Sequence, residues 1–216
     1  MYSLVFERLF AAYGPQHWWP ADTSFEVMIG AVLTQNTAWT NVERALRQLS
    51  VNVPLTAEAL LAMPESDLAH LIRPAGYFNL KARRLRAFCA AFRAAGGESG
   101  LSRLETTALR ALLLDIHGIG PETADDMLLY AFRRPVFVVD TYTRRLFGRI
   151  GLLDGREPYE TIRSAFEQAL GADQVLFNEY HALIVRHAKA ACRARNPLCI
   201  QCCLTGVCAG VGTPSV

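Results

Sequence analysis

The chain has 216 residues, of which 51% are hydrophobic and 19% are charged, and its formal net charge is +2. This composition predicts a compact protein with a substantial core and excludes an intrinsically disordered chain. No apolar run reaches the length of a membrane span, and the start MYSLVFERLF lacks the pattern of a signal peptide. We therefore expect a cytoplasmic protein with no membrane partner.

Helix signals follow one another along most of the chain. Thr23 with Glu26, and Thr40 with Glu43, have the spacing of a capping box, in which a hydroxyl caps a helix and a carboxylate follows three residues later. Helices are also expected in KARRLRAFCAAFRAA, TYTRRLFGRI, YETIRSAFEQAL and LFNEYHALIVRHAKAAC. The one strand-like run, VFVV at 136–139, is too short and isolated to predict a sheet, so the expected fold class is all-α.

Basic residues gather in three stretches of this nearly neutral chain. Neither 71–96 nor 180–216 contains an acidic residue, and a third cluster lies between 133 and 149. Any one of these clusters could equally be a solvated helix face. Three of them together favour a polyanionic partner.

The segments LRALLLDI and PETADDMLLYAF are apolar at helical spacing and are joined by HGIG, which predicts a helix-hairpin-helix motif at about 113–132. Glycines permit a tight turn, and the amide groups of such a hairpin can bind a phosphate without reading base sequence. Asp125 and Asp126 read most simply as a solvated helix face. The residues expected to contact a nucleic-acid backbone are His117, Gly118, Ile119, Gly120, Thr123 and, from the basic helix, Lys81.

Five of the six cysteines lie after residue 191. Four of them form the pattern C-x6-C-x2-C-x5-C, which suits a tetrahedral zinc ion or an iron–sulfur cluster, and spacing alone does not decide between the two. Disulfides are disfavoured because cytosolic thiols stay reduced. Cys203 could replace its neighbour Cys202 by a one-residue slip, and Cys89 is expected in the core. The predicted ligands are Cys192, Cys199, Cys202 and Cys208.

Four segments occur in the order of a known family: GYFNLKARRL, HGIGPETAD, FVVDTYTRRLF and the four-cysteine pattern. Together they resemble the endonuclease III branch of the helix-hairpin-helix DNA glycosylases. The resemblance favours a [4Fe–4S] cluster over zinc. It also implies a two-lobed all-α fold, with a six-helix barrel at 22–135 and a cluster lobe formed by 1–21 and 136–216. Double-stranded DNA would lie across the groove between the lobes, with the damaged nucleotide extruded.

The resemblance places the catalytic carboxylate at Asp140. A carboxylate beside the anomeric carbon can stabilise an oxocarbenium-like transition state and can orient or deprotonate the attacking water. An aspartate after an apolar run is otherwise a helix N-cap, and Asp140 could serve in both ways. Isolated histidines, such as His181 and His187, are expected to be packed or solvated.

Glu122 is a departure from the pattern of the bifunctional members. Those enzymes carry a lysine two residues after the second hairpin glycine, and its amine forms a Schiff base that leads to strand cleavage. A carboxylate cannot form an imine, so the usual lyase mechanism is not expected. Glu122 could be structural in the first turn of its helix, could act as a second carboxylate, or could hydrogen-bond the extruded base.

The second departure is aromatic. WWP at 18–20 and TQNTAW at 34–39 resemble the 3-methyladenine glycosylase branch of the same superfamily. Flat aromatic faces suit a positively charged alkylated purine, although the tryptophans could instead be packing residues. Gln35 or Asn36 matches the polar plug that fills the gap left by the flipped nucleotide, and a cap or turn role is the alternative. The predicted pocket residues are Trp18, Trp19, Trp39, Gln35 and Asn36.

The hypothesis is a monomeric, monofunctional glycosylase that removes alkylated purines such as 3-methyladenine. One alternative is an endonuclease III-like glycosylase for oxidised pyrimidines with weak lyase activity. Another is a catalytically silent protein that binds damaged DNA.

Overall fold

The structure is a computed structural model and describes residues 1–210. It is all-α, since no β-strand occurs among these residues, which confirms the predicted fold class. The chain divides into two compact units, one formed by Met1–Pro20 together with the chain from Pro135 onward, and the other by Ala21–Arg134. The predicted lobe boundaries differ from these by one residue at each junction.

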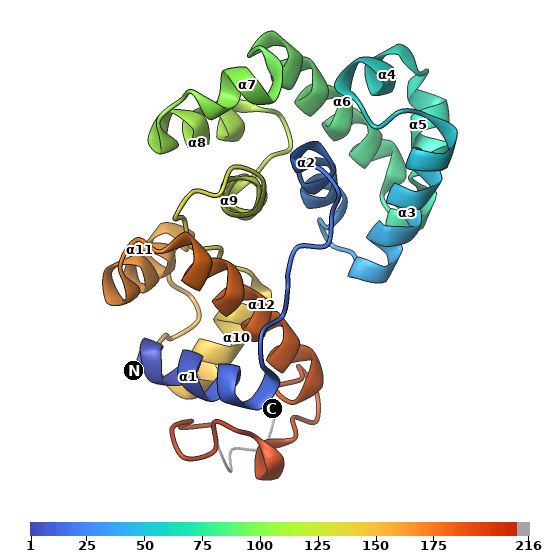
Figure 1. The fold of residues 1–216 in the computed structure, drawn as a ribbon. Coiled ribbons are helices and arrows are strands. Elements are labelled where there is room, and N and C mark those ends of the chain that lie inside the picture. The colour runs from blue at the N-terminus through green and yellow to red at the C-terminus, as the bar shows by residue number, and fades with distance from the viewer. Residues whose placement is uncertain (211–216) are drawn as a thin grey trace. The chain divides into compact units, whose positions relative to one another are not determined.

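The second unit holds the helices from α2 to the π-helical turn η2 (Figure 1). They are α2 (Ser24–Leu33), α3 (Trp39–Asn52), α4 (Ala57–Ala62), α5 (Glu65–Leu71), η1 (Arg73–Ala75), α6 (Phe78–Ala94), α7 (Gly97–Ser102), α8 (Thr106–Asp115), α9 (Pro121–Asp126) and η2 (Met127–Ala131). Figure 1 shows α2 enclosed by the arc that runs from α3 to α9, and α2 packs against α3, α6, α9 and η2. Apolar residues cover nearly its whole circumference, which is the pattern of a central, buried helix.

The two predicted capping boxes have different outcomes. Thr23 caps α2 by accepting a hydrogen bond from the Glu26 amide at 3.1 Å, while the Glu26 carboxylate accepts from the Asp22 amide. Thr40 caps nothing, because α3 already begins at Trp39. The second capping-box prediction was therefore wrong.

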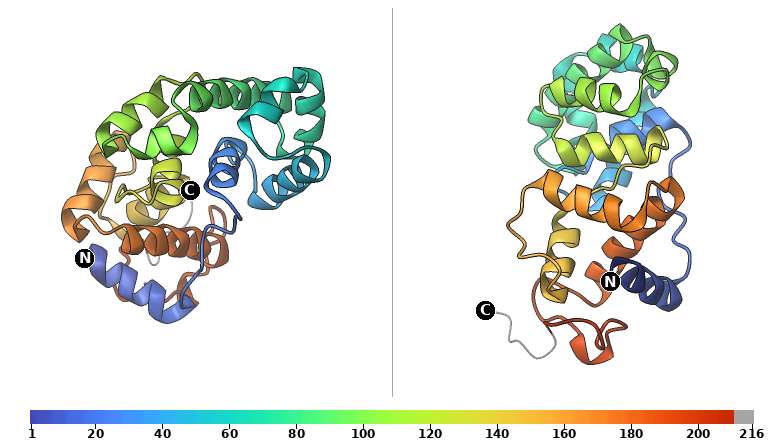
Figure 2. Two further views of the ribbon diagram at one scale, coloured as in Figure 1. Left: turned by 45° about the horizontal axis from the view of Figure 1, so that its top comes forward. Right: turned by 90° about the vertical axis from the view of Figure 1, so that its left-hand side faces the viewer.

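The first unit contains α1 (Tyr2–Tyr13), α10 (Thr141–Ile150), α11 (Tyr159–Leu170), α12 (Gln174–Ala190) and the short turn η3 (Cys199–Gln201). Within it α1 packs on α11 and α12, and α10 packs on α12 (Figure 2). Stacked and edge-on aromatic rings form its core; the Phe137 and Phe166 centroids, for example, are 4.0 Å apart. This core anchors the extended run 136–139 and thereby fixes the residue that follows it, Asp140.

Asp125 and Asp126 are buried, so their prediction as a solvated helix face was wrong. Asp125 is fully buried and takes two hydrogen bonds from the Arg110 guanidinium, at 2.6 and 3.1 Å. This bidentate salt bridge compensates the burial of both charges and joins α8 to α9. Among residues 1–210, no helix is long and apolar enough to cross a membrane.

Candidate functional site

Asp140 stands at the N-cap of α10 and is 8% exposed. Its Oδ1 accepts hydrogen bonds from the Thr143 amide at 2.7 Å and from the Thr143 hydroxyl at 2.9 Å. Its Oδ2 lies 3.5 Å from Nε2 of His181, a buried residue of α12. The predicted N-cap role is thus present, and one carboxylate oxygen is not used by the cap.

The environment of Asp140 keeps its carboxylate ionised. Burial by itself raises the pKa of Asp140. The hydrogen bond and charge of His181 and the two hydrogen bonds from Thr143 outweigh burial, so the pKa lies below its ordinary value. A desolvated negative charge is therefore available at neutral pH, and sequence reasoning had given His181 no role in it.

The predicted hairpin spans the end of α8, the turn at 116–120 and the start of α9. Gly118 has a φ of +89°, in the left-handed region that favours glycine. A Cβ on Gly118 would also overlap the side chain of Arg84. Gly120 has an extended backbone, and a Cβ there would meet no neighbouring atom within 4 Å. Only Gly118 is required by the fold itself.

Gln35 connects the turn after α2 to this hairpin. Its amide nitrogen donates to the Gly118 carbonyl at 2.9 Å and to the Thr123 hydroxyl at 3.0 Å. Its amide oxygen accepts from the Arg84 guanidinium of α6. Both ends of the amide are engaged, so the structure gives Gln35 a role in holding the hairpin. Sequence reasoning missed Arg84 because it was one of several arginines on a basic helix.

Asn36 is exposed and has a φ of 54°. Asparagine tolerates this left-handed conformation better than most residues do, and Asn36 lies in the turn that follows α2. Trp39, half-buried at the start of α3, donates from its ring nitrogen to Glu43 at 2.8 Å. Trp18 and Trp19 are half-buried in the first unit, with ring centroids 5.5 Å apart.

Lys81 is 1% exposed, and its ammonium donates to the Leu33 carbonyl at 2.8 Å and to the Ala75 carbonyl at 2.7 Å. Burial, together with the nearby charge of Arg84, lowers the pKa of Lys81 to about 8. The predicted contact of Lys81 with DNA is corrected accordingly. This lysine is a structural residue that satisfies carbonyl groups at the ends of α2 and η1.

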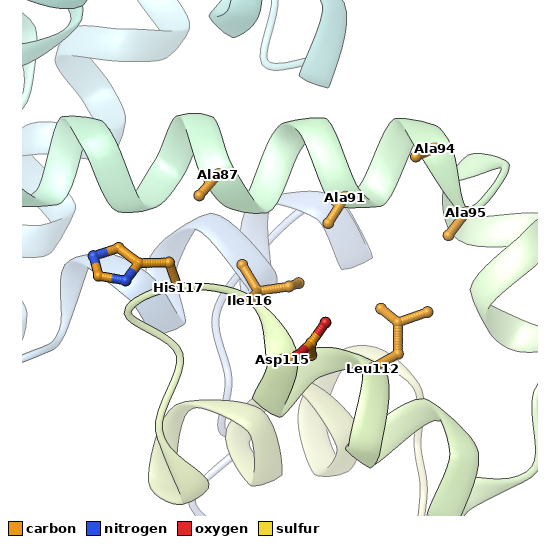
Figure 3. A pocket seen from close by; sticks show the side chains of 8 residues that line it. All are labelled: Ala87, Ala91, Ala94, Ala95, Leu112, Asp115, Ile116 and His117. Atoms are coloured by element: carbon orange, nitrogen blue, oxygen red, sulfur yellow. The ribbon is translucent and has the colours of Figure 1, made fainter.

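The remaining hairpin residues divide by exposure. Ile119 and Thr123 are 5% exposed, so only their backbone groups could meet a DNA backbone. His117 and Glu122 are exposed. A groove of about 420 Å³ runs beside the hairpin, between α6 and the end of α8. Figure 3 shows the alanines of α6 facing Leu112 and Ile116 across this groove, with His117 at one end.

The cysteine-rich segment brings the four predicted ligands into one another's electrostatic range. Burial raises the pKa of Cys202, and the nearby Cys203, Cys192 and Cys208 sulfurs raise it further. Burial also raises the pKa of Cys208, with Cys192 and Cys199 adding to the effect. Cys203, by contrast, is near Cys202 and Arg8. Cys202 thus interacts electrostatically with Cys192 and Cys208, two of the other predicted ligands.

Single-metal geometry is absent from the described residues. Among residues 1–210, no three His, Cys, Asp or Glu side chains converge closely enough to hold one metal ion. A zinc site would require four sulfurs at about 2.3 Å from a single centre. A cluster takes each thiolate on a different iron atom, so its four sulfurs stand farther apart. Cys89 is buried in the core, as predicted, and burial raises its pKa to about 12.

The all-α fold with its glycine hairpin between α8 and α9 is that of a helix-hairpin-helix protein. The family model described as "HhH-GPD superfamily base excision DNA repair protein" matches residues 29–171 of this chain. The chain belongs to this superfamily, and it is accordingly a base-excision DNA glycosylase that acts on DNA.

Individual relatives agree with this assignment. A protein of Methanocaldococcus jannaschii, named as a candidate DNA repair glycosylase, is 44% identical over 94% of each chain. Endonuclease III of Thermotoga maritima is 32% identical, over 85% of this chain and 82% of its own. A solved structure of 3-methyladenine DNA glycosylase from H. pylori, bound to 1,N6-ethenoadenine, is 28% identical. Its TM-score is 0.75, and the match covers 87% of this chain and 97% of that one.

Proposed function

We propose that this glycosylase is monofunctional and removes alkylated purines such as 3-methyladenine from double-stranded DNA. The observation that carries the proposal is the buried, ionised carboxylate of Asp140, which within residues 1–210 contacts His181 and Thr143 but no lysine. The chain has only two lysines. Lys81 is held in the core, and Lys189 lies 5.8 Å from the Tyr142 ring in a cation–π contact.

The chemistry asked of Asp140 is modest for such a substrate. A 3-methylated adenine carries positive charge on its ring, so the base leaves as a neutral molecule when the glycosidic electron pair moves to its nitrogen. Positive charge then develops on the sugar, where the Asp140 carboxylate stabilises it. A water oxygen bonds to the anomeric carbon and gives its proton to the carboxylate or to solvent. Hydrolysis is complete without a covalent enzyme intermediate.

The proposed substrate is supported by the aromatic residues of the chain and by its similarity to a 3-methyladenine glycosylase. Tryptophan faces attract a cationic purine by stacking and by cation–π interaction, and Trp18, Trp19 and Trp39 are each partly exposed. The H. pylori relative is described as a 3-methyladenine glycosylase bound to a modified adenine. Exposed Glu122 in the first turn of α9 leaves the hairpin without the amine that a lyase needs.

The test is release of free base from duplex DNA that contains 3-methyladenine, measured before any alkali or heat. Asp140→Asn keeps an oxygen that can accept from Thr143 but removes the charge, and we expect base release to fall at least about 100-fold. The matched control is Asp173→Asn. Asp173 is an exposed aspartate that caps α12 through the Leu176 amide, and its substitution should leave the rate unchanged.

Two other outcomes correspond to the alternatives. Release of oxidised pyrimidines, with an adduct that borohydride can trap, would indicate an endonuclease III-like activity with lyase chemistry. Binding of damaged DNA with no release of any base would indicate a silent binder. Either result overturns the proposed substrate assignment.

We further propose that Cys192, Cys199, Cys202 and Cys208 hold a [4Fe–4S] cluster. Support comes from the electrostatic contacts among these sulfurs and from the resemblance of the cysteine spacing to the family's cluster loop. When bound, the cluster would supply structural cross-linking of the segment after α12. The adjacent cysteines provide the test. The purified Cys202→Ser variant should contain less iron and inorganic sulfide than the unaltered protein, whereas Cys203→Ser should retain both.

A further inference from the structure

A buried tyrosine–histidine pair stands against one of the proposed cluster ligands. His187, on α12, is fully buried, and its Nδ1 lies 2.9 Å from the hydroxyl of Tyr13 at the end of α1. Its Nε2 lies 3.5 Å from the Cys202 sulfur. The Cys203 sulfur is 4.0 Å from Nδ1, farther than the tyrosine oxygen. The ring therefore connects α1 to the cysteine-rich segment.

The chemistry of a ligating sulfur decides which ring nitrogen carries the proton. A thiolate bound to iron has no proton and can only accept a hydrogen bond. Nε2 must then carry the hydrogen that points to Cys202. In a neutral imidazole Nδ1 is consequently an acceptor, and the Tyr13 hydroxyl is positioned to donate to it.

Two further donors point at the same group of sulfurs. The Arg149 guanidinium donates to the Cys192 sulfur at 3.3 Å, and the Leu204 amide donates to the Cys202 sulfur at 3.4 Å. The Arg149 guanidinium also donates hydrogen bonds to the Arg193 and Ala194 carbonyls, which fix its position. Cys202 thus has two donors, one from the backbone and one from a side chain whose orientation a second side chain fixes.

We propose that Tyr13 and His187 form a hydrogen-bond relay that holds an N–H group on the Cys202 thiolate. The relay raises the reduction potential of the cluster and protects it from oxidative loss. This inference rests on the proposed cluster. Hydrogen bonds to cluster sulfurs stabilise the form with more negative charge, which is the reduced form, and outer-shell partners of metal ligands also orient the ligand. Removing the donor should therefore make the cluster easier to oxidise.

The experiment compares reduction potentials and rates of cluster bleaching in air for the intact protein and four variants. His187→Phe removes the donor, and we expect a shift of the potential to more negative values with faster bleaching. His187→Gln retains a side-chain N–H and should recover part of the shift. Tyr13→Phe leaves the His187 imidazole in place but removes the hydroxyl that fixes its tautomer. It should therefore shift the potential in the same direction as His187→Phe, by a smaller amount.

The matched control is Tyr2→Phe, the same change on the same helix. The Tyr2 ring packs on Phe147 and Phe166, away from the cysteines, so the potential should not move. If His187→Phe does not fold, Tyr13→Phe still decides the question, because it leaves the imidazole in place. An unchanged potential in Tyr13→Phe, in protein that carries a full complement of iron, overturns the relay. Intact protein with no iron and no sulfide would instead overturn the proposed cluster itself.

Discussion

Gly118 and Gly120 occupy the same hairpin but face different requirements. A side chain at Gly118 would adopt a left-handed backbone and overlap Arg84, whereas Gly120 has an ordinary extended backbone with open space beside it. We expect Gly118→Ala to lower the free energy of unfolding by about 2 kcal/mol and Gly120→Ala to leave it nearly unchanged. Urea unfolding of the two variants measures this difference.

The same pair of variants separates folding from DNA contact. If the hairpin backbone approaches phosphate at Gly120, then Gly120→Ala should weaken binding to undamaged duplex DNA although the protein stays fully folded. Equal destabilisation by both substitutions would contradict the local geometry. Unchanged DNA binding in Gly120→Ala would show that the space beside this glycine is not used.

Asp140 links protonation to stability at the scale of one residue. Its pKa in the folded protein lies below the ordinary value of 3.8, so folding favours the ionised form. This contribution is fully present above about pH 3.8 and is lost as the pH falls through the lower, folded-state pKa. Asp140→Asn lacks it at every pH. The free energies of unfolding of the two proteins should therefore converge as the pH falls below about 3.8, as thermal unfolding in a series of buffers can measure. A difference that is constant with pH would contradict this expectation.

At the scale of elements, the hairpin depends on a hydrogen-bond network as well as on its glycine. Gln35 and Thr123 come from segments far apart in the sequence, yet their side chains are 3.0 Å apart. A double-mutant cycle with Gln35→Ala and Thr123→Val should give a coupling energy of about 1 kcal/mol in unfolding experiments. Gln35→Ala combined with Ser164→Ala, whose hydroxyl accepts from the exposed Gln168 in the other unit, should be additive. Additivity in the Gln35–Thr123 pair would contradict the network.

Elements defined by local chemistry were predictable from the sequence. The hairpin, the cap at Thr23 and the all-α class follow from glycine, hydroxyl and apolar spacing, which act over a few residues. Thr40 shows the limit, because the N-cap of α3 is Ala38, two residues before the predicted cap, and the Trp39 ring nitrogen bonds Glu43 in the first turn. A choice between two starting points so close together depends on such contacts more than on propensity.

Side-chain assignments failed where tertiary burial decides them. Lys81 and Asp125 look like surface charges in the sequence, and only the fold reveals the two carbonyls and the arginine that compensate their burial. Asp140 was predicted from a family pattern, and the four cysteines were predicted from their spacing. Their partners His181 and His187 carry no pattern of their own, since each is distant in sequence from the residue that it contacts.

At the scale of the whole molecule, net charge says little and its distribution says more. The chain is only slightly basic, but residues 180–216 contain no acidic residue and include the exposed Arg186, Arg193 and Arg195. Phosphate contacts release counterions from DNA, so each one steepens the fall of affinity with salt by about 0.9 in a log–log plot. We expect Arg195→Gln to reduce the salt slope for undamaged duplex DNA by about that amount.

Arg156→Gln provides the control for that measurement. Arg156 is also exposed and its loss changes the net charge equally, but it lies in a loop with Asp154 and Glu157 that a DNA backbone would avoid. If long-range charge alone steered the protein to DNA, both variants would lower affinity alike, and the slope would change by the same small amount in each. A slope that changes only in Arg195→Gln assigns the effect to a phosphate contact beside the cysteine-rich segment. Equal effects would place the DNA-binding charge elsewhere on the molecule.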